Sequence, residues 1–302
     1  MSLWIPITLF AAFMQNLRFM LQKHLKDTRL STGGATFSRF VFAAPLAVLF
    51  VAVATGTGWR TLPSISWRFL LFASAGGVTQ ILATLCIVAL FSLRNFTVGI
   101  TLKKTETVQT ALISLILLGE TVSIMGLLAI AVGLVGVVLV SDPPKSASVL
   151  GWRGRVFNRA SGLGLLSGAL FGMSATGYRG ASLALGGGDF MIRAAVTLAY
   201  VTVFQSILMA LWLRWRTPGQ IRALARAWRV TGLVGVTGAL GSFAWFMAFT
   251  LENAAYVKAL GQVELVFTFL ASIFVFHEKS SVRELAGIFL VMASILLLVF
   301  LI

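Results

Sequence analysis

The sequence is poor in charged residues, and it has very few acids, histidines and cysteines. Only 11% of its 302 residues are charged, with 9 Asp and Glu against 24 Lys and Arg, and there are 2 histidines and 1 cysteine. The single cysteine, Cys86, excludes a disulfide framework. The chain has no HExxH motif and no His/Asp cluster with metal spacing, and His24 and His277 lie near the ends of predicted helices, so we predict no metal and no cofactor. These absences disfavour a membrane enzyme.

Apolar residues make up 58% of the chain, and the mean hydropathy is +0.95. A soluble domain of this length does not need so much apolar surface, and a helix that crosses the hydrocarbon core needs about 20 mainly apolar residues. The continuous apolar runs are about twice as long as a barrel strand, which disfavours a transmembrane β-barrel. We predict an all-α membrane protein with ten transmembrane helices, near residues 3–22, 36–54, 67–92, 97–118, 121–140, 160–184, 189–213, 228–250, 254–276 and 281–301.

The net charge of +15 belongs to the connections between these helices. The connections after the first, third, fifth, seventh and ninth helices carry most of the basic residues, so the positive-inside rule places them in the cytoplasm and both termini outside. Because the charge lies in loops beside a bilayer, we predict a lipid partner and no nucleic acid. We expect a multi-pass protein of the bacterial inner (cell) membrane.

The chain repeats itself at an offset of 158 residues, which aligns residues 77–120 with 235–278 without a gap. The halves are residues 1–141 and 160–302, joined by a linker at 142–159, and each holds five predicted helices. Because five is odd, the second half enters the membrane inverted, an arrangement that supports alternating access to a solute site between the repeats. An old duplication retained for packing also predicts inverted halves. The polar matches are Asn95/Asn253, Glu106/Glu264, Thr110/Thr268, Ser114/Ser272 and Glu120/Glu278.

A polar stripe runs along the fourth predicted helix, in the segment "TLKKTETVQT". At 100° per residue, Lys103, Glu106, Thr107, Thr110 and Ser114 share one face, and Lys104 lies at its flank. Ionisable groups within a membrane are costly and indicate a functional site with a partner. Two interpretations stand side by side. Lys103 and Glu106 form an ion pair that only fixes packing, or these groups meet a solute or carry a coupling proton.

The second half carries an equivalent stripe, with Glu264, Thr268 and Ser272 on one face and Lys258 near it. The groups expected deep in the membrane are Arg18, Lys103, Lys104 and Lys258 against Glu106 and Glu264, and this positive excess favours an anionic or zwitterionic solute. Arg18 either lines the cavity or marks its mouth, and Arg39 is expected to snorkel to the interface. The candidate substrate-binding residues are Arg18, Gln80, Lys103, Lys104, Glu106, Thr110, Trp245, Tyr256, Lys258, Gln262, Glu264 and Thr268.

The segments "LISLILLGETVSIMGLLAIAVGLVGVVLV" and "LASIFVFHEKSSVRELAGIFLVMASILLLVF" resemble the repeat of the EamA family in the drug/metabolite transporter superfamily. The matching marks are Gly119-Glu120 and His277-Glu278 at the short turn, followed by an aliphatic helix rich in small residues. The resemblance implies ten helices in two five-helix halves and transport of small metabolites. It also implies cytoplasmic termini, which is the opposite of what the basic residues indicate.

Two departures from the family pattern concern the centre of the membrane. Glu106-Thr107 and Glu264-Leu265 stand where many members have a proline, and the first helix has Arg18 where small multidrug relatives have a coupling glutamate. Glu106 and Glu264 are therefore the candidates for proton coupling. Lys103 and Lys104 align with Gly261 and Gln262, so the lysines break the repeat symmetry and are the first candidates for solute specificity.

We therefore predict a secondary transporter that moves a small polar or amphipathic metabolite by alternating access. No nucleotide-binding loop is present in the sequence, so ATP drive would need another chain. A channel or a structural membrane subunit is the alternative, with a membrane enzyme behind both. The predicted partners are a small-molecule solute and the bilayer, and both a monomer and a homodimer fit the sequence.

Overall fold

In a computed structural model of the chain, which describes residues 2–26, 31–91, 102–140, 159–226, 228–274 and 281–301, helices account for nearly all regular structure. The described residues contain no strand, only an isolated antiparallel bridge between Ser64 and Gly186. The predicted all-α class is confirmed. The chain divides into a first unit, residues 1–78 and 177–252, and a second unit, residues 79–176 and 253–302. Each unit therefore combines helices from both halves of the sequence.

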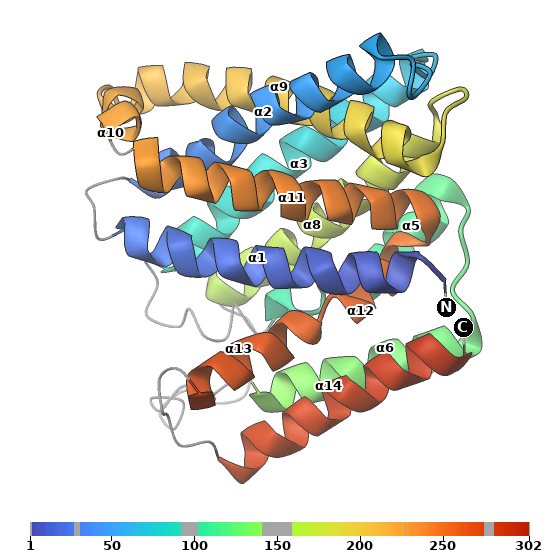
Figure 1. The fold of residues 1–302 in the computed structure, drawn as a ribbon. Coiled ribbons are helices and arrows are strands. Elements are labelled where there is room, and N and C mark those ends of the chain that lie inside the picture. Colours follow the sequence, from blue (N-terminus) through green and yellow to red (C-terminus); the bar gives the residue numbers. More distant parts are fainter. Residues whose placement is uncertain are drawn as a thin grey trace. The chain divides into compact units, whose positions relative to one another are not determined.

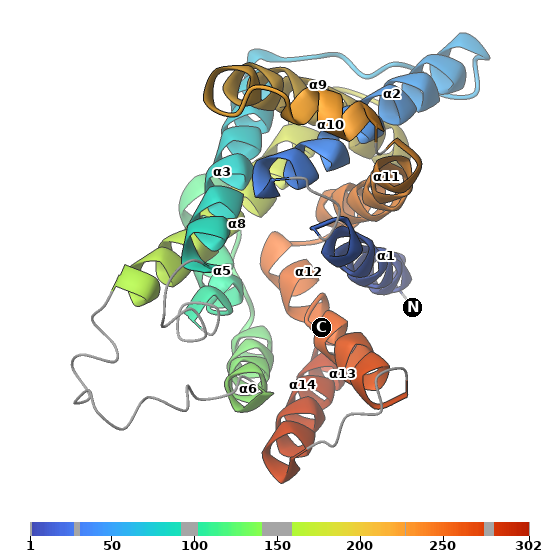
Figure 2. The same ribbon diagram turned by 90° about the vertical axis from the view of Figure 1, so that its left-hand side faces the viewer.

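The first unit pairs helices in antiparallel fashion, with α1 beside α11 and α2 beside α9 (Figure 1; Figure 2). Gly33, near the start of α2, packs against Trp212 near the end of α9, where a Cβ on the glycine would lie 3.0 Å from the indole ring. The helices of this unit are α1 (Trp4–Lys26), α2 (Thr32–Gly56), the start of α3 (Trp67–Phe91), the end of α8 (Arg159–Leu183), α9 (Phe190–Arg216), α10 (Gln220–Arg226) and α11 (Trp228–Leu251).

At the other end of α2 and α9, polar contacts join the two connecting loops. Asp189 caps α9, because its Oδ1 accepts a hydrogen bond from the backbone N–H of Ile192 at 3.0 Å, and its Oδ2 lies 3.1 Å from Nε of Arg60. The bridge between Ser64 and Gly186 holds the α2–α3 loop beside the α8–α9 loop. These contacts fix the ends of the helices at this side of the unit.

The second unit is built on a close pair of antiparallel helices, α6 and α14 (Figure 1). A Cβ on Gly136 would lie 2.7 Å from the carbonyl oxygen of Gly287, so the two backbones meet where neither residue has a side chain. Ser294 donates a hydrogen bond to the carbonyl of Ala129 at 2.7 Å in the same pair. The helices of this unit are the end of α3, α5 (Glu106–Leu118), α6 (Ile124–Val140), the start of α8, α12 (Ala254–Leu260), α13 (Val263–Phe274) and α14 (Val282–Leu301).

The predicted helix at 254–276 is divided, because α12 ends at Leu260 and α13 begins at Val263. Gly261 stands at the break, and glycine has a low helix propensity. The N–H of Gln262 donates to the carbonyl of Ala259, and the N–H of Leu265 donates to the carbonyl of Gln262. Both bonds span three residues, as in a 3₁₀ turn, and not the four of an α-helix. In the first half a turn at residues 104–105 precedes α5, which begins only at Glu106. Residues 97–101 and 275–276 of the two predicted helices lie outside the described residues. The two halves therefore interrupt their helices at nearly equivalent positions.

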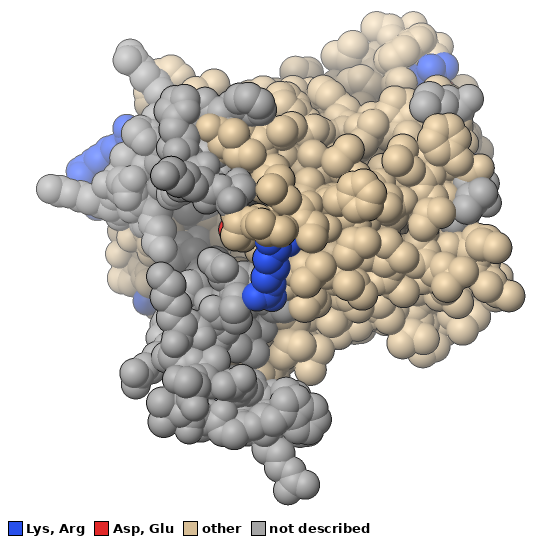
Figure 3. Space-filling model, turned by 90° about the horizontal axis from the view of Figure 1, so that it is seen from below, with Lys and Arg blue, Asp and Glu red and all other residues tan. Residues whose placement is uncertain are grey.

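Five described segments are long and apolar enough to cross a membrane, and α5 and α6 are apolar but shorter. Exposed side chains on these helices are large and apolar, as at Ile116 (79% exposed) and Phe289 (70%). Figure 3 shows one face, seen from below, on which the described residues are mostly uncharged and few side chains are charged. An integral multi-pass membrane protein is confirmed. The five segments are Thr36–Gly56, Trp67–Ile87, Phe190–Arg216, Gly232–Leu251 and Val282–Phe300.

Candidate functional site

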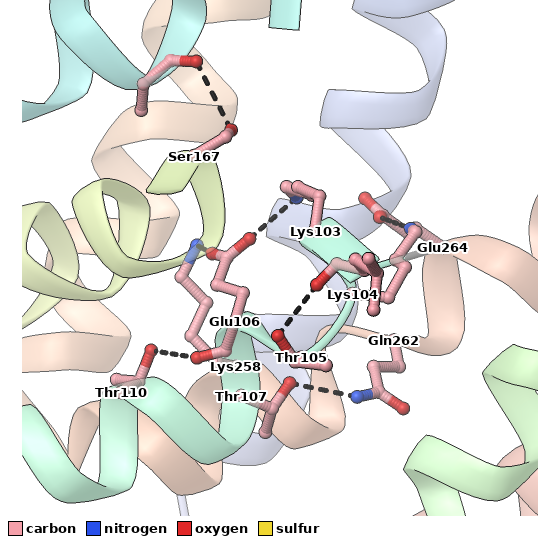
Figure 4. A network of polar contacts seen from close by, with 12 residues as sticks. Lys103, Lys104, Thr105, Glu106, Thr107, Thr110, Ser167, Lys258, Gln262 and Glu264 are labelled. Atoms are coloured by element: carbon pink, nitrogen blue, oxygen red, sulfur yellow. Dashed lines mark hydrogen bonds and ion pairs between the residues drawn. The ribbon is translucent and has the colours of Figure 1, made fainter. Parts of the chain in front are cut away.

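In the second unit, the carboxylate of Glu106 bridges two lysines (Figure 4). Its Oε2 lies 2.6 Å from Nζ of Lys103, three residues earlier, and its Oε1 lies 2.6 Å from Nζ of Lys258. The Glu106 side chain is 8% exposed, whereas the two lysine side chains are 22% and 23% exposed. The ion pair predicted between Lys103 and Glu106 is therefore present, and a lysine from the other half of the sequence joins it.

The second glutamate takes part in the reciprocal contact. Nζ of Lys104 donates a hydrogen bond to Oε1 of Glu264 at 3.2 Å, so a lysine of the first half meets a glutamate of the second (Figure 4). The side chains of Gln262 and Thr107 form a third link between the halves, because Nε2 of the glutamine donates to Oγ1 of the threonine at 2.9 Å. We call Lys103, Lys104, Glu106, Lys258 and Glu264 the charge network.

The repeat explains where the two carboxylates lie. Glu106 is the first residue of α5 and Glu264 the second residue of α13, so each stands in the first turn of a helix that begins after an interruption. The N-terminus of a helix carries a partial positive charge from its free N–H groups, which favours a carboxylate there. The same local rule therefore acts on both glutamates, 158 residues apart in the sequence.

Two residues of the predicted stripe face a different neighbour. Oγ1 of Thr110 donates to the carbonyl of Glu106 at 2.7 Å, and a Cβ on Gly172 of α8 would lie 2.9 Å from this Oγ1. Oγ of Ser114 lies 3.0 Å from Oγ1 of Thr176, also on α8. Thr110 and Ser114 therefore pack against α8, whereas Lys103 and Glu106 belong to the charge network.

Tyr256, a candidate substrate-binding residue, anchors α12 to the start of α6. Its hydroxyl accepts a hydrogen bond from Ser123 N–H at 2.8 Å and donates to Ser123 Oγ at 3.3 Å. The ring lies against Gly126, where a Cβ would overlap it. These contacts account for Tyr256 as a structural residue of the second unit.

Of the remaining candidates in the second unit, Gln80 lies half-buried on α3, where its carbonyl accepts a hydrogen bond from Thr84 Oγ1 at 2.8 Å. Thr268 lies in α13, and its side chain is outside the part of the chain that is described. Within the described ranges, no group of three His, Cys, Asp or Glu residues could hold a metal ion.

Arg18 and Trp245 belong to the first unit, not to the unit that holds the charge network. Arg18 is buried, with 4% of its surface exposed, and Trp245 is 9% exposed. The indole Nε1–H of Trp245 donates to Oε1 of Gln15 at 3.1 Å, and its ring stacks on Phe249 at a centroid distance of 5.8 Å. The structure therefore divides the predicted site residues between two units.

One polar contact of the first unit was not predicted from the sequence. Nη2 of Arg39, a residue that we expect to snorkel to the interface, donates to Oγ of Ser242 on α11 at 3.1 Å. Its stem also lies against Gly238 of the same helix. An intramembrane arginine opposite a helix with glycine and serine one turn apart is the sequence signal that could have indicated this contact.

Comparison with known proteins places these features in a family. The EamA-like transporter family matches the chain over residues 2–142 and 162–300. A crystal structure of a protein matches with a TM-score of 0.72 and 12% sequence identity, covering 99% of this chain and 96% of that one. At this identity the similarity concerns the fold alone. Among curated proteins, no sequence matches the chain.

Proposed function

Because the chain belongs to the EamA-like transporter family, we propose that it is a secondary transporter that moves a small polar or amphipathic metabolite by alternating access. The family assignment confirms the membership of the drug/metabolite transporter superfamily that the sequence predicted. Members of the family are transporters and not enzymes, which supports the same interpretation. We propose ten spans in two inverted repeats, residues 1–141 and 160–302, with 142–159 as the linker, in a bacterial inner membrane.

The observation that carries this proposal is the reciprocal pairing in the charge network. Lys258 meets Glu106, and Lys104 meets Glu264, so each carboxylate is bound by a lysine from the other half of the sequence. Alternating access moves one repeat against the other around a site near the midplane. Such a motion would break or rearrange the ion pairs between the repeats. A charged solute would then form new ion pairs with the lysines or glutamates that had lost their partners.

The charge of the network supports an anionic or zwitterionic solute. Three lysines face two glutamates, which leaves one net positive charge. A carboxylate or phosphate group on the solute would balance this charge, and the ammonium group of a zwitterion would take the place of a lysine beside Glu106 or Glu264. Because the three lysines have no duplicated counterparts, we assign solute specificity to them.

We further propose that Glu106 or Glu264 carries the coupling proton, if transport is proton-driven. The described part of α1 has Arg18 and no acidic residue, so the first helix offers no carboxylate for this role. Uptake measured with and without a pH gradient will show whether transport is proton-driven, because a proton-coupled solute accumulates only when the gradient is imposed.

The test begins with purified protein, screened for thermal stabilisation by a library of small metabolites. A solute that binds the folded state raises the unfolding midpoint by mass action. We expect hits among carboxylates, phosphate esters and zwitterions, and we expect E106Q and E264Q to lose the stabilisation by zwitterions, because each variant removes a carboxylate that would hold the ammonium group. E284Q is the matched control, because Glu284 caps α14 through Ser281, and glutamine can replace glutamate in such a capping box.

The hits are then measured for uptake into proteoliposomes. Saturable uptake supports a transporter, whereas uptake that rises linearly with concentration indicates a channel, and no uptake of any hit indicates a structural subunit. If E106Q and E264Q both keep saturable transport with unchanged pH dependence, the proposed role of the charge network is wrong.

A further inference from the structure

A short helix of the first unit, α10, lies where two apolar spans end. The span that α9 forms ends at Arg216, and the span that α11 forms begins at Gly232, so α10 falls in the connection between them. It packs against α9, α2 and α11 (Figure 1). Because both neighbouring spans end here, α10 lies at the surface of the membrane and not within the hydrocarbon core.

Polar contacts fix α10 to the ends of α9 and α2. Gly219, with a φ of 98°, makes the turn after α9, and the N–H of Gln220 donates to the carbonyl of Thr217 at 3.3 Å. Oε1 of Gln220 accepts a hydrogen bond at 2.8 Å from the N–H of Ser31, which precedes α2. Leu224 is 5% exposed, so its side of α10 faces the rest of the unit. The helix therefore has a fixed inner face.

Two arginines stand next to one another on the outer face of α10. At 100° per residue, Arg222 and Arg226 each lie about 160° from Leu224, on either side, and about 40° from one another. Both side chains are exposed, and residues four apart on a helix have Cβ atoms about 5–6 Å apart. Like charges at this spacing disfavour a helix, and an anion that binds both removes the cost. The geometry therefore favours an anionic ligand that approaches from outside.

The end of α9 adds two arginines and a tryptophan. Arg214 and Arg216 are exposed in its last turn, and the guanidinium carbon of Arg216 lies 5.4 Å from the centroid of the Trp215 ring. Trp215 is 79% exposed, and Trp228, the first residue of α11, is 60% exposed. Exposed tryptophans at the ends of spans mark the level of the lipid headgroups. The arginines of α9 and α10 therefore lie near that level.

The sequence places no acidic residue in these helices, since none occurs from Phe190 to Leu251. The described acidic residues of the first unit, Asp189 and Glu252, precede α9 and follow α11, so each lies at the opposite end of a long helix from α10. The α9 helix alone spans about 40 Å at 1.5 Å per residue. Asp27 falls outside the described residues. The α10 end of α9 and α11 therefore presents a positive potential.

We propose that this end of the first unit binds anionic phospholipid headgroups, with Arg222 and Arg226 at the centre of the surface. The planar fork of an arginine matches phosphate oxygens, and basic residues at the membrane surface attract anionic lipids. Phosphatidylglycerol has a phosphate diester and no ammonium group, so it keeps a negative charge that phosphatidylcholine lacks. We therefore expect the surface to prefer phosphatidylglycerol. The surface is separate from the charge network, and it consists of Arg214, Arg216, Arg222 and Arg226.

The test follows the thermal unfolding midpoint of purified protein in mixed micelles, while phosphatidylglycerol replaces phosphatidylcholine at constant total lipid. A lipid that binds the folded state raises the midpoint by mass action. We expect R222Q and R226Q each to weaken the apparent affinity for phosphatidylglycerol roughly fivefold, because a basic residue near the membrane surface contributes about 1 kcal/mol. R68Q is the matched control, since Arg68 is exposed at the start of α3, at the other end of the unit, and the variant loses the same charge.

Lysine variants and salt show whether charge is responsible. R222K and R226K keep the charge, so we expect them to keep most of the preference for phosphatidylglycerol that the glutamine variants lose. A higher salt concentration should weaken the preference of the wild-type chain, because it screens exposed charges. Both measurements remain decisive if a glutamine variant does not fold.

Three results would overturn the proposal. In the first, phosphatidylglycerol stabilises the wild-type chain no more than phosphatidylcholine does. In the second, R68Q weakens the effect as much as R222Q and R226Q do. In the third, inorganic phosphate gives the same stabilisation with the same dependence on Arg222 and Arg226, so that the ligand is a soluble anion and not a headgroup. Because the readout is stability in lipid, each of these failures would leave the proposed transport function untouched.

Discussion

Glu106 and Lys258 lie 2.6 Å apart although they come from opposite halves of the sequence, and Lys104 and Glu264 repeat this relationship with the halves exchanged. The glutamates are duplicates of one another, 158 residues apart, but the lysines are not, because Lys104 aligns with Gln262 and Lys258 with Ile100. Two lysines at positions that the repeat does not relate therefore pair with two glutamates at positions that it does relate. The reciprocal arrangement is a property of the folded chain and not of the duplication alone.

Removal of the shared carboxylate should destabilise the protein more than removal of either lysine. E106Q leaves Lys103 and Lys258 close together without an anion between them, and loss of one member of a buried pair costs about 3–5 kcal/mol. In K258Q the pair of Glu106 with Lys103 remains, so the cost should be smaller. The unfolding midpoints of E106Q and K258Q in detergent show which variant is the less stable. A loss in E106Q no greater than in K258Q would contradict this order.

Lys104 and Glu264 should be energetically coupled. Their side chains are 21% and 22% exposed and 3.2 Å apart, so K104Q and E264Q remove the same contact. In a double-mutant cycle we expect the two losses of unfolding free energy to be non-additive by about 0.5–3 kcal/mol. Strict additivity would show that the pair contributes nothing.

The meeting of α6 and α14 depends on two glycines. G136A and G287A each place a Cβ 2.7 Å from a backbone oxygen of the opposite helix, and neither backbone can move aside alone. We expect each to lower the unfolding free energy by about 1–3 kcal/mol. G162A in α8 is the control, because nothing lies within 4 Å of its Cβ and alanine favours a helix. Equal stability of G136A and G162A would contradict the observed packing.

The hydroxyl of Thr107 should stabilise the protein as a hydrogen-bond acceptor for Gln262, and not only by filling space. T107V keeps the shape but leaves the buried Nε2 of Gln262 without its acceptor, at a cost of about 1–3 kcal/mol, whereas T107S keeps the hydroxyl. Thermal unfolding of the two variants measures the difference. If T107V is no more destabilised than T107S, the hydrogen bond from Gln262 contributes nothing measurable to stability.

The sequence predicted much of this site because its signals are local and repeated. The offset of 158 residues identified Glu106 and Glu264 as related positions, and the spacing of Lys103 and Glu106 predicted their ion pair, which the structure contains. Hydropathy predicted the helices, since a bilayer demands long apolar runs. The ion pair and the helices needed only neighbours along one helix, and the repeat needed only a comparison of the sequence with itself.

Contacts between helices could not be predicted in this way. A helical wheel places Thr110 and Ser114 on the face of Glu106, but only the packing of α8 shows that they meet α8 instead. The pairing of Lys258 with Glu106 depends on how α12 approaches α5. The interruption at Gly261 was missed because apolar residues continue on both sides of it, although the glycine and the neighbouring Gln262 were visible.

Counterflow in proteoliposomes tests the transport role of the charge network most directly. Vesicles loaded with an unlabelled solute from the stabilisation screen should take up the labelled solute saturably with the wild-type chain and with E284Q. Folded E106Q and E264Q should lose this exchange, because the carboxylates take part in binding the solute. Saturable counterflow at wild-type rates in both variants would contradict a role for these residues in transport.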